Sequence, residues 1–253
     1  MARPLTDGRS KVIAQATLTA PAVFFQAVGY LRVPRLIDTA QVELLRDLAH
    51  RMAEGADHEH VGRSPEKTRI DQVVSFDTTF LEVATSDQVL DALEPLLGPN
   101  VELVENRHNH VSIYRAPSTD RLHRDILQWS RSILTVLVYL SDCTDLDSAT
   151  RVVPGSHLWP CIGKPNNGGT WMAEVEPYAS LLDQAVAMPA GVGDAVLMHG
   201  QLYHAGAGVS PAGPRVVLTL AYRSVDELAE EVPARCRIVR GGRIHRSRGA
   251  ARV

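Results

Sequence analysis

The chain has few cysteines and no long apolar segment. Only 3 of its 253 residues are Cys, and Cys143, Cys161 and Cys236 are far apart and odd in number. This pattern fits neither a disulfide framework nor a cysteine zinc site and is typical of a reducing compartment, so we expect a cytoplasmic protein. No apolar run reaches the roughly 18 residues of a membrane-spanning helix, and the first residues lack the apolar core of a signal peptide. We therefore expect no membrane partner.

Lysine is also scarce, and the basic charge comes mostly from arginine. The formal net charge is −3, and an excess of acidic residues makes nucleic acid an improbable partner. The segment 235–253 nevertheless contains seven arginines and no acidic residue. We expect a partly frayed terminus with solvated charges there, and contact with nucleic acid or an anionic surface is the alternative.

The composition is that of a globular protein, with 45% hydrophobic and 22% charged residues, which excludes a disordered or fibrous chain. No repeat or linker divides it. We expect an N-terminal extension over 1–22, a single domain over 23–230 and an Arg-rich tail over 231–253. Helical patterns come first and strand patterns follow. This order predicts a mainly β fold, a jelly-roll or double-stranded β-helix, with a helical buttress.

The N-terminal third contains clear helix signals. A short helix is predicted over 22–28, followed by a strand over 29–33. Asp38, with Gln41 three residues later, forms a capping-box pattern. Apolar residues then recur at helical spacing as far as Gly55, so a helix is predicted between Asp38 and Gly55.

A further helix begins at Ser86 or the next residue. Pro95 predicts that it ends near Glu94, because proline disfavours helical geometry at the preceding residue. From Val101 the period changes to two, and strands are predicted over residues 101–115, 132–141, 150–154, 194–199 and 215–223. Residues 133–140 are apolar on both faces, which predicts a sheet covered by helices on one side and by a second sheet on the other.

His123 and Asp125 are the first candidates for chemistry. They lie two residues apart in an extended segment, so both side chains point to the same face. A histidine from a distant strand would complete the two-histidine, one-carboxylate triad of non-haem Fe(II) oxygenases. His199 and His204 are candidates for that third ligand. A His–Asp pair at the surface is the alternative, because an H-x-D tripeptide often occurs by chance.

Arg215 stands at the head of an otherwise apolar strand. By alternation it faces the same way as Val217 and Thr219. An arginine that points inward needs an anion, and a guanidinium group binds a carboxylate through two parallel hydrogen bonds. The distal carboxylate of 2-oxoglutarate would serve as that anion.

Four stretches of the chain occur in a characteristic order. They are Phe24–Val33 followed by a helix, His123-Arg124-Asp125 with Trp129 shortly after, Val153-Pro154-Gly155-Ser156-His157, and His204 with Arg215 eleven residues later. Together they resemble the phytanoyl-CoA dioxygenase family of Fe(II)/2-oxoglutarate enzymes, and the resemblance covers about residues 24–223. It implies that His204, and not His199, joins His123 and Asp125 as the Fe(II) ligands, and that His157 is a structural turn residue.

The resemblance also implies 2-oxoglutarate and O2 as co-substrates. Arg215 would bind 2-oxoglutarate, with Asn109, Thr135 and Ser210 as further contacts. Thr135 is expected to face inward on its strand. Ser210 is the weakest of these contacts, because it stands one residue before the position where the family often has a hydroxyl group, and that position is Pro211.

The expected function is hydroxylation of a small molecule, in the tailoring of a secondary metabolite such as an antibiotic. Stereoinversion, desaturation and ring closure begin with the same removal of a substrate hydrogen and are alternatives. Trp129 and Arg223 are the candidate substrate contacts. Alternatively, Trp129 only fills the mouth of the barrel, and Arg223 forms a salt bridge at the surface. His108 and His110 are expected to be solvated or locally bonded. A ligand-binding jelly-roll without catalysis, or a cupin-type enzyme without 2-oxoglutarate, is disfavoured by Arg215.

Overall fold

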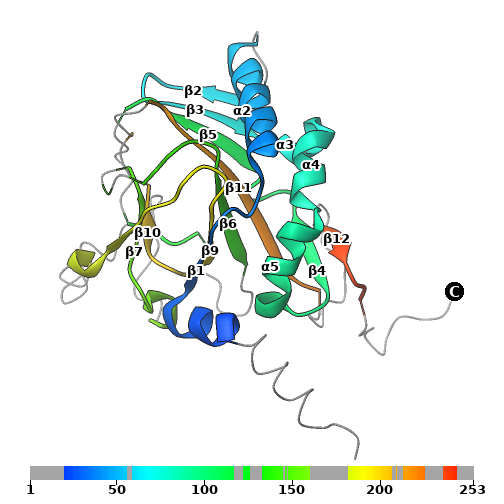
Figure 1. Cartoon of the computed structure of the whole chain (residues 1–253), viewed down its shortest axis with the longest axis vertical. Helices are drawn as coiled ribbons and strands as arrows, with labels where there is room; N and C mark the ends of the chain where they lie inside the picture. The colour runs from blue at the N-terminus through cyan, green and yellow to red at the C-terminus, as the bar shows by residue number, and fades with distance from the viewer. Residues whose placement is uncertain are drawn as a thin grey trace, which may run out of the picture.

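The computed structural model describes most of the chain between residues 20 and 243. The described residues are 20–55, 59–116, 122–125, 133–144, 146, 148–159, 182–206, 209, 213–225 and 236–243. Within these ranges no helix is long and apolar enough to cross a membrane. The strands form two antiparallel sheets, which confirms the expected mainly β architecture (Figure 1).

Within the described residues the larger sheet has nine strands and the smaller has three. The nine are β1 (Tyr30–Val33), β2 (Val61–Arg63), β3 (Lys67–Asp71), β4 (Val101–Val104), β5 (His110–Tyr114), β6 (Leu134–Tyr139), β9 (Ala195–His199), β11 (Arg215–Ser224) and β12 (Cys236–Arg240). Their order is β1-β9-β6-β11-β5-β3-β2, and β4 pairs with both β11 and β12. The small sheet has the order β10-β7-β8, with the bounds β7 (Thr150–Val152), β8 (Val186–Met188) and β10 (His204–Ala205).

Helices cover one face of the large sheet (Figure 1). They are α2 (Thr39–Glu54), α3 (Val73–Phe76), α4 (Thr78–Ala84) and α5 (Asp87–Leu97), and a further helix over 20–28 precedes β1. The predicted capping box of α2 is confirmed. The Asp38 carboxylate accepts from the Gln41 N–H at 2.8 Å, and the Gln41 side chain accepts from the Asp38 N–H at 3.1 Å. Gly55 ends this helix, as predicted.

The predicted end of α5 near Glu94 is wrong. The helix continues through Pro95 to Leu97, because a proline this close to the end removes only one hydrogen bond of the last turn. Leu96 and Leu97 pack against the main core, which favours the longer helix. Gly98, with a φ of 84°, then ends it and donates its N–H to the Glu94 carbonyl at 2.8 Å.

The single strand predicted over 101–115 is also wrong, because a turn divides it into β4 and β5. His108 has a φ of 50° in this turn. The Asn109 side chain accepts from the Val74 N–H at 3.0 Å and donates to the Glu105 carbonyl at 2.9 Å. Side-chain bonds of this kind compete with strand pairing and favour turns. The strands β2, β3, β8, β10 and β12 were not predicted.

Side-chain alternation on β6 and β11 builds two apolar layers. The residues that face the helices include Val136, Val138, Val216, Leu218 and Leu220, and those that face the small sheet include Leu137, Tyr139 and Val217. The second set packs with Val152 of β7 and Met188 of β8. This arrangement confirms the prediction that the segment 133–140 is covered on both sides.

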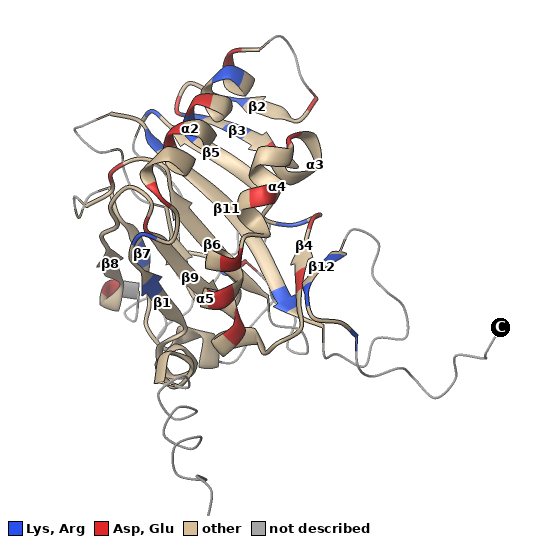
Figure 2. Ribbon diagram, turned by 45° about the vertical axis from the view of Figure 1, so that its right-hand side comes forward, with Lys and Arg blue, Asp and Glu red and all other residues tan. Residues whose placement is uncertain are grey.

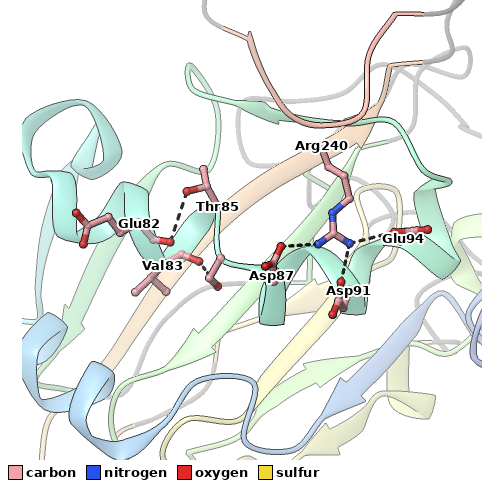
Figure 3. Close-up of polar contacts among 8 residues, drawn as sticks. Glu82, Val83, Thr85, Asp87, Asp91, Glu94 and Arg240 are labelled. Atoms are coloured by element: carbon pink, nitrogen blue, oxygen red, sulfur yellow. Dashed lines mark hydrogen bonds and ion pairs between the residues drawn. The ribbon is translucent and has the colours of Figure 1, made fainter.

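Part of the segment 231–253, which was expected to be a tail, belongs to the large sheet. Strand β12 pairs with β4, so the sheet extends past the boundary predicted at residue 230. The Arg240 guanidinium fastens this strand to α5 (Figure 3). It donates to Asp91 at 2.7 Å and to Asp87 and Glu94 at 3.0 Å. Figure 2 shows the acidic residues of α5 in red and the basic residues of β12 in blue.

Replacement of Arg240 should destabilise the protein slightly and in a salt-dependent way. Exposed ion pairs contribute about 0.2–1 kcal/mol each, so Arg240→Ala should lower the free energy of unfolding by about 1 kcal/mol at low ionic strength. The difference should shrink in about 1 M salt, where charges are screened over about 3 Å. Urea unfolding at both salt concentrations measures it, with Arg237→Ala as a control that removes one ion pair. A salt-independent loss of several kcal/mol would contradict this account.

Candidate active site

A cavity of about 240 Å³ lies between the two sheets. Its walls come from alternate residues of neighbouring strands, because side chains on one face of a strand are two residues apart. The lining residues include Lys67 and Arg69 of β3, His110, Ser112 and Tyr114 of β5, Thr135 and Leu137 of β6, Thr150 of β7, His204 of β10, and Arg215, Val217 and Thr219 of β11. The strand register sets Lys67 and Arg215 on either side of Tyr114.

Three side chains of the metal-ligand type meet at one end of this cavity. His123, Asp125 and His204 each offer one atom, and these atoms lie within 4.8 Å of one another. Nε2 of His204 is 3.5 Å from Oδ1 of Asp125, and Nε2 of His123 is 4.0 Å from the same oxygen. The backbone causes this convergence, since His123 and His204 face each other in an antiparallel bridge with N–H···O distances of 2.9 and 3.0 Å. The structure therefore brings the three predicted residues together.

Neighbouring groups orient these side chains. Nδ1 of His204 lies 3.0 Å from the Leu202 carbonyl, so Nδ1 carries the proton and Nε2 keeps a free lone pair. The Thr135 hydroxyl donates to Oδ2 of Asp125 at 2.7 Å. Burial acts to raise the pKa of Asp125, but His204, His108 and the Thr135 hydrogen bond outweigh it, and the pKa is lowered. Asp125 is therefore a carboxylate at neutral pH.

Buried positive charge occupies another part of the cavity wall. Arg215 is 3% exposed, and its Nη2 donates to Thr150 at 2.8 Å. Its Nε has no hydrogen-bond partner among the residues that the structure describes. Lys67 and Arg215 lie 4.6 and 5.0 Å from the centre of the Tyr114 ring. Among the described residues no carboxylate forms an ion pair with either cation. A buried charge is costly unless it is paired, so this end of the cavity suits a small anion.

Lys67 was not among the site residues predicted from the sequence. Lys67, Arg69 and Asp71 alternate with the buried residues Thr68 and Ile70. This period of two indicates a strand with one charged face and one buried face. That alternation is the signal that could have identified β3 and its lysine.

The chain is similar in sequence to proteins of a known family. The model of the phytanoyl-CoA dioxygenase (PhyH) family matches residues 25–217. The chain belongs to this family. A relative, the iron/alpha-ketoglutarate-dependent dioxygenase ausU from Aspergillus calidoustus, is 31% identical over 102 residues. That match covers 40% of this PhyH-family chain and 29% of the length of ausU.

Solved structures show the same fold. The epimerase SnoN, crystallised with Fe3+, alpha ketoglutarate and nogalamycin RO, has a TM-score of 0.71 and 19% identity, and the match covers 88% of this chain and 94% of SnoN. HygX from Streptomyces hygroscopicus, with nickel, 2-oxoglutarate and hygromycin B bound, has a TM-score of 0.59 and 17% identity, with coverages of 81% and 86%. The expected jelly-roll fold is therefore confirmed for this PhyH-family protein.

The other predicted co-substrate contacts lie in different places. Thr135 lines the cavity, and its hydroxyl binds Asp125. Asn109 does not line this cavity, because both ends of its amide are bonded to backbone groups of the turn and of α3. Ser210 lies outside the described residues, as does Trp129.

Four other histidines singled out from the sequence form two pairs. His199 stays outside the ligand cluster, and its Nδ1 accepts from the Gln201 N–H at 3.1 Å. Burial lowers the pKa of His199 to about 4, so the ring is neutral at pH 7. His157 lies beside it, with the ring centroids 5.0 Å apart. His108 and His110 line the cavity and are not part of the ligand cluster.

Arg223 is not a lining residue of this cavity. It lies near the opposite end of β11 from Arg215, and its guanidinium forms an ion pair with Glu102, directly opposite on β4. Both side chains are buried. Nη2 of Arg243 lies 3.6 Å from the second carboxylate oxygen of Glu102. The structure thus gives Arg223 the salt-bridge partner that was its alternative role, in the protein interior and not at the surface.

Arg223→Ala should lower the free energy of unfolding by about 3–5 kcal/mol, because it leaves the buried charge of Glu102 without its main partner. Replacing both residues with Leu should recover most of this loss. Chemical unfolding measures the stability, and titration with 2-oxoglutarate should show unchanged affinity in the folded fraction. Unchanged stability of Arg223→Ala would contradict this structural role.

Proposed function

We propose that the protein is an Fe(II)- and 2-oxoglutarate-dependent oxygenase that acts on a small molecule. One observation carries the proposal: a single cavity contains both the His123, Asp125 and His204 cluster and the buried cation Arg215. A metal ion complements the cluster, and a small dicarboxylate complements the arginine. Membership of the phytanoyl-CoA dioxygenase family and the similarity to ausU support the same activity.

The cluster fits Fe(II). Two imidazoles and one carboxylate are the ligand set that holds non-haem Fe(II) on one face and leaves other positions open. Metal–ligand distances of about 2.1 Å place two ligands at right angles about 3 Å apart. The separations from Oδ1 of Asp125, 3.5 Å to His204 and 4.0 Å to His123, are longer than this value, so the three ligand atoms would draw together around a bound ion. Bound iron would supply the open positions for 2-oxoglutarate and O2 and the oxidising chemistry.

Other side chains bind 2-oxoglutarate and orient the metal ligands. Arg215 binds the distal carboxylate of 2-oxoglutarate, held in place by the Thr150 hydroxyl. Lys67 adds a second positive charge on the other side of Tyr114. The Thr135 hydroxyl fixes the orientation of Asp125, so that one carboxylate oxygen stays directed at the metal position.

Hydroxylation in the tailoring of a secondary metabolite is the proposed outcome. Stereoinversion is the second candidate, favoured by the fold that the chain shares with the epimerase SnoN. Both begin with removal of a substrate hydrogen and need the same protein ligands. We also place the protein in the cytoplasm, where the buried free thiol of Cys143 stays reduced.

Binding of 2-oxoglutarate tests the proposed function. In protein loaded with Fe(II) under anaerobic conditions, Arg215→Ala should weaken 2-oxoglutarate binding by about 30-fold or more, since truncating one partner of a buried charge pair costs about 2–5 kcal/mol. Lys67→Ala should weaken it about tenfold, as expected for one charge-assisted hydrogen bond. Calorimetry measures both, and the affinity for Fe(II) should change little.

Arg151→Ala is the matched control, because Arg151 follows Thr150 on β7 and is exposed. It should bind 2-oxoglutarate as the wild type does. Equal affinities in the wild type and in Arg215→Ala would contradict the assignment of the co-substrate site.

A further inference from the structure

A second cavity, of about 430 Å³, adjoins the first. The two cavities share Arg69, His108 and Asp125 as lining residues. Nε2 of His108 lies 3.4 Å from Oδ1 of Asp125 and has no hydrogen-bond partner in the described structure. The second cavity therefore reaches one proposed metal ligand, Asp125, and among its described lining residues it has neither Arg215 nor the two histidine ligands.

We propose that this second cavity binds the primary substrate and that the substrate is a hydrophilic compound rich in hydroxyl and amino groups. The inference rests on the proposed function for the identity of the reaction. The class of substrate follows from the chemistry of the cavity wall. Ligand pockets are lined mostly by apolar and aromatic side chains. Here every described lining residue is charged, an imidazole or an amide.

The charged groups of the cavity wall limit the class of substrate that can bind. Apart from the proposed ligand Asp125, the wall contains three carboxylates and two guanidinium groups, namely Glu59, Asp71, Glu105, Arg69 and Arg107. Asp71 is paired with Arg69 at 2.8 Å and Glu105 with Arg237 at 2.6 Å, so these charges are largely compensated within the protein. The wall therefore offers a substrate hydrogen-bond donors and acceptors and not a net charge. A fatty chain would displace water from these groups without replacing its hydrogen bonds, which is costly. Hydroxyl and amino groups replace those hydrogen bonds.

The backbone around this cavity is strained. Among the described residues three that are not glycine have a positive φ, and two of them, Gln72 at 60° and His108 at 50°, line the second cavity. Such conformations are costly and cluster at ligand sites, where the surrounding structure holds them. Hydrogen bonds from Asn109 stabilise both of these backbone conformations. The backbone carbonyl of Asn109 accepts from the Gln72 N–H at 2.6 Å. Its side-chain amide binds backbone groups of Val74 and Glu105. Asn109 thus joins the two walls of the cavity and is a positioning residue for them.

A bulky side chain at the rim of the second cavity tests the inference without turnover. Asn106 is an exposed turn residue that lines only this cavity, so Asn106→Trp should fill it and leave the first cavity intact. The probes are kanamycin A, an amine-bearing polyol, and palmitoyl-CoA. Each is titrated by calorimetry into anaerobic protein that has been loaded with Fe(II) and 2-oxoglutarate.

We expect the wild type to bind kanamycin A more tightly than palmitoyl-CoA, and Asn106→Trp to weaken kanamycin A binding by about tenfold or more. The control Glu43→Trp, on the exposed face of α2 and lining neither cavity, should bind as the wild type does. Unchanged 2-oxoglutarate affinity and melting temperature show that the Asn106→Trp protein is folded.

Three results would overturn the inference: no binding of kanamycin A, binding that Asn106→Trp leaves unchanged, or tighter binding of palmitoyl-CoA. A different result would show that the proposed function itself is wrong. In that case the wild type does not bind 2-oxoglutarate, while the probe titrations still report on the second cavity.

Discussion

Strand β11 pairs with β6 on one side and with β5 and β4 on the other, and side-chain alternation along this central strand decides which of its residues face the proposed co-substrate site. One face of the strand is buried in the core beneath the helices, and the other faces the small sheet. Arg215 and Arg223 lie on this second face, near opposite ends of the strand. One strand therefore carries the cation of the proposed co-substrate site and a buried structural ion pair.

The two arginines differ in how their charge is compensated, and this difference separates function from structure. Glu102 neutralises Arg223 across one rung of the sheet. Arg215 has hydroxyl and aromatic neighbours and forms no ion pair with a described carboxylate. Because an unpaired buried charge is unfavourable, the protein is expected to gain stability when an anion enters beside Arg215. The Asp125 carboxylate, with three histidines around it, has the corresponding relation to a metal cation.

Local patterns predicted much of the fold and the core of the site, but contacts distant in sequence decided the rest. The capping box of α2, the alternation of β6 and β11 and the same-face pair His123 and Asp125 are local, so they could be read from the chain. The choice of His204 depended on the family resemblance, because its bridge to His123 spans 81 positions (204 − 123). Asn109 fits a strand pattern, yet its bond to Val74 makes it part of a turn. Lys67 enters the site only because β3 pairs with β5.

The stoichiometry and site of Fe(II) binding show whether His123, Asp125 and His204 form the metal site. Anaerobic titration of the wild type, His204→Ala and His199→Ala with Fe(II), followed by metal analysis after gel filtration, compares a residue of the cluster with a histidine outside it. We expect one Fe(II) per chain in the wild type and in His199→Ala, and almost none in His204→Ala. Retention of iron by His204→Ala, or its loss from His199→Ala, would show that the metal is held elsewhere.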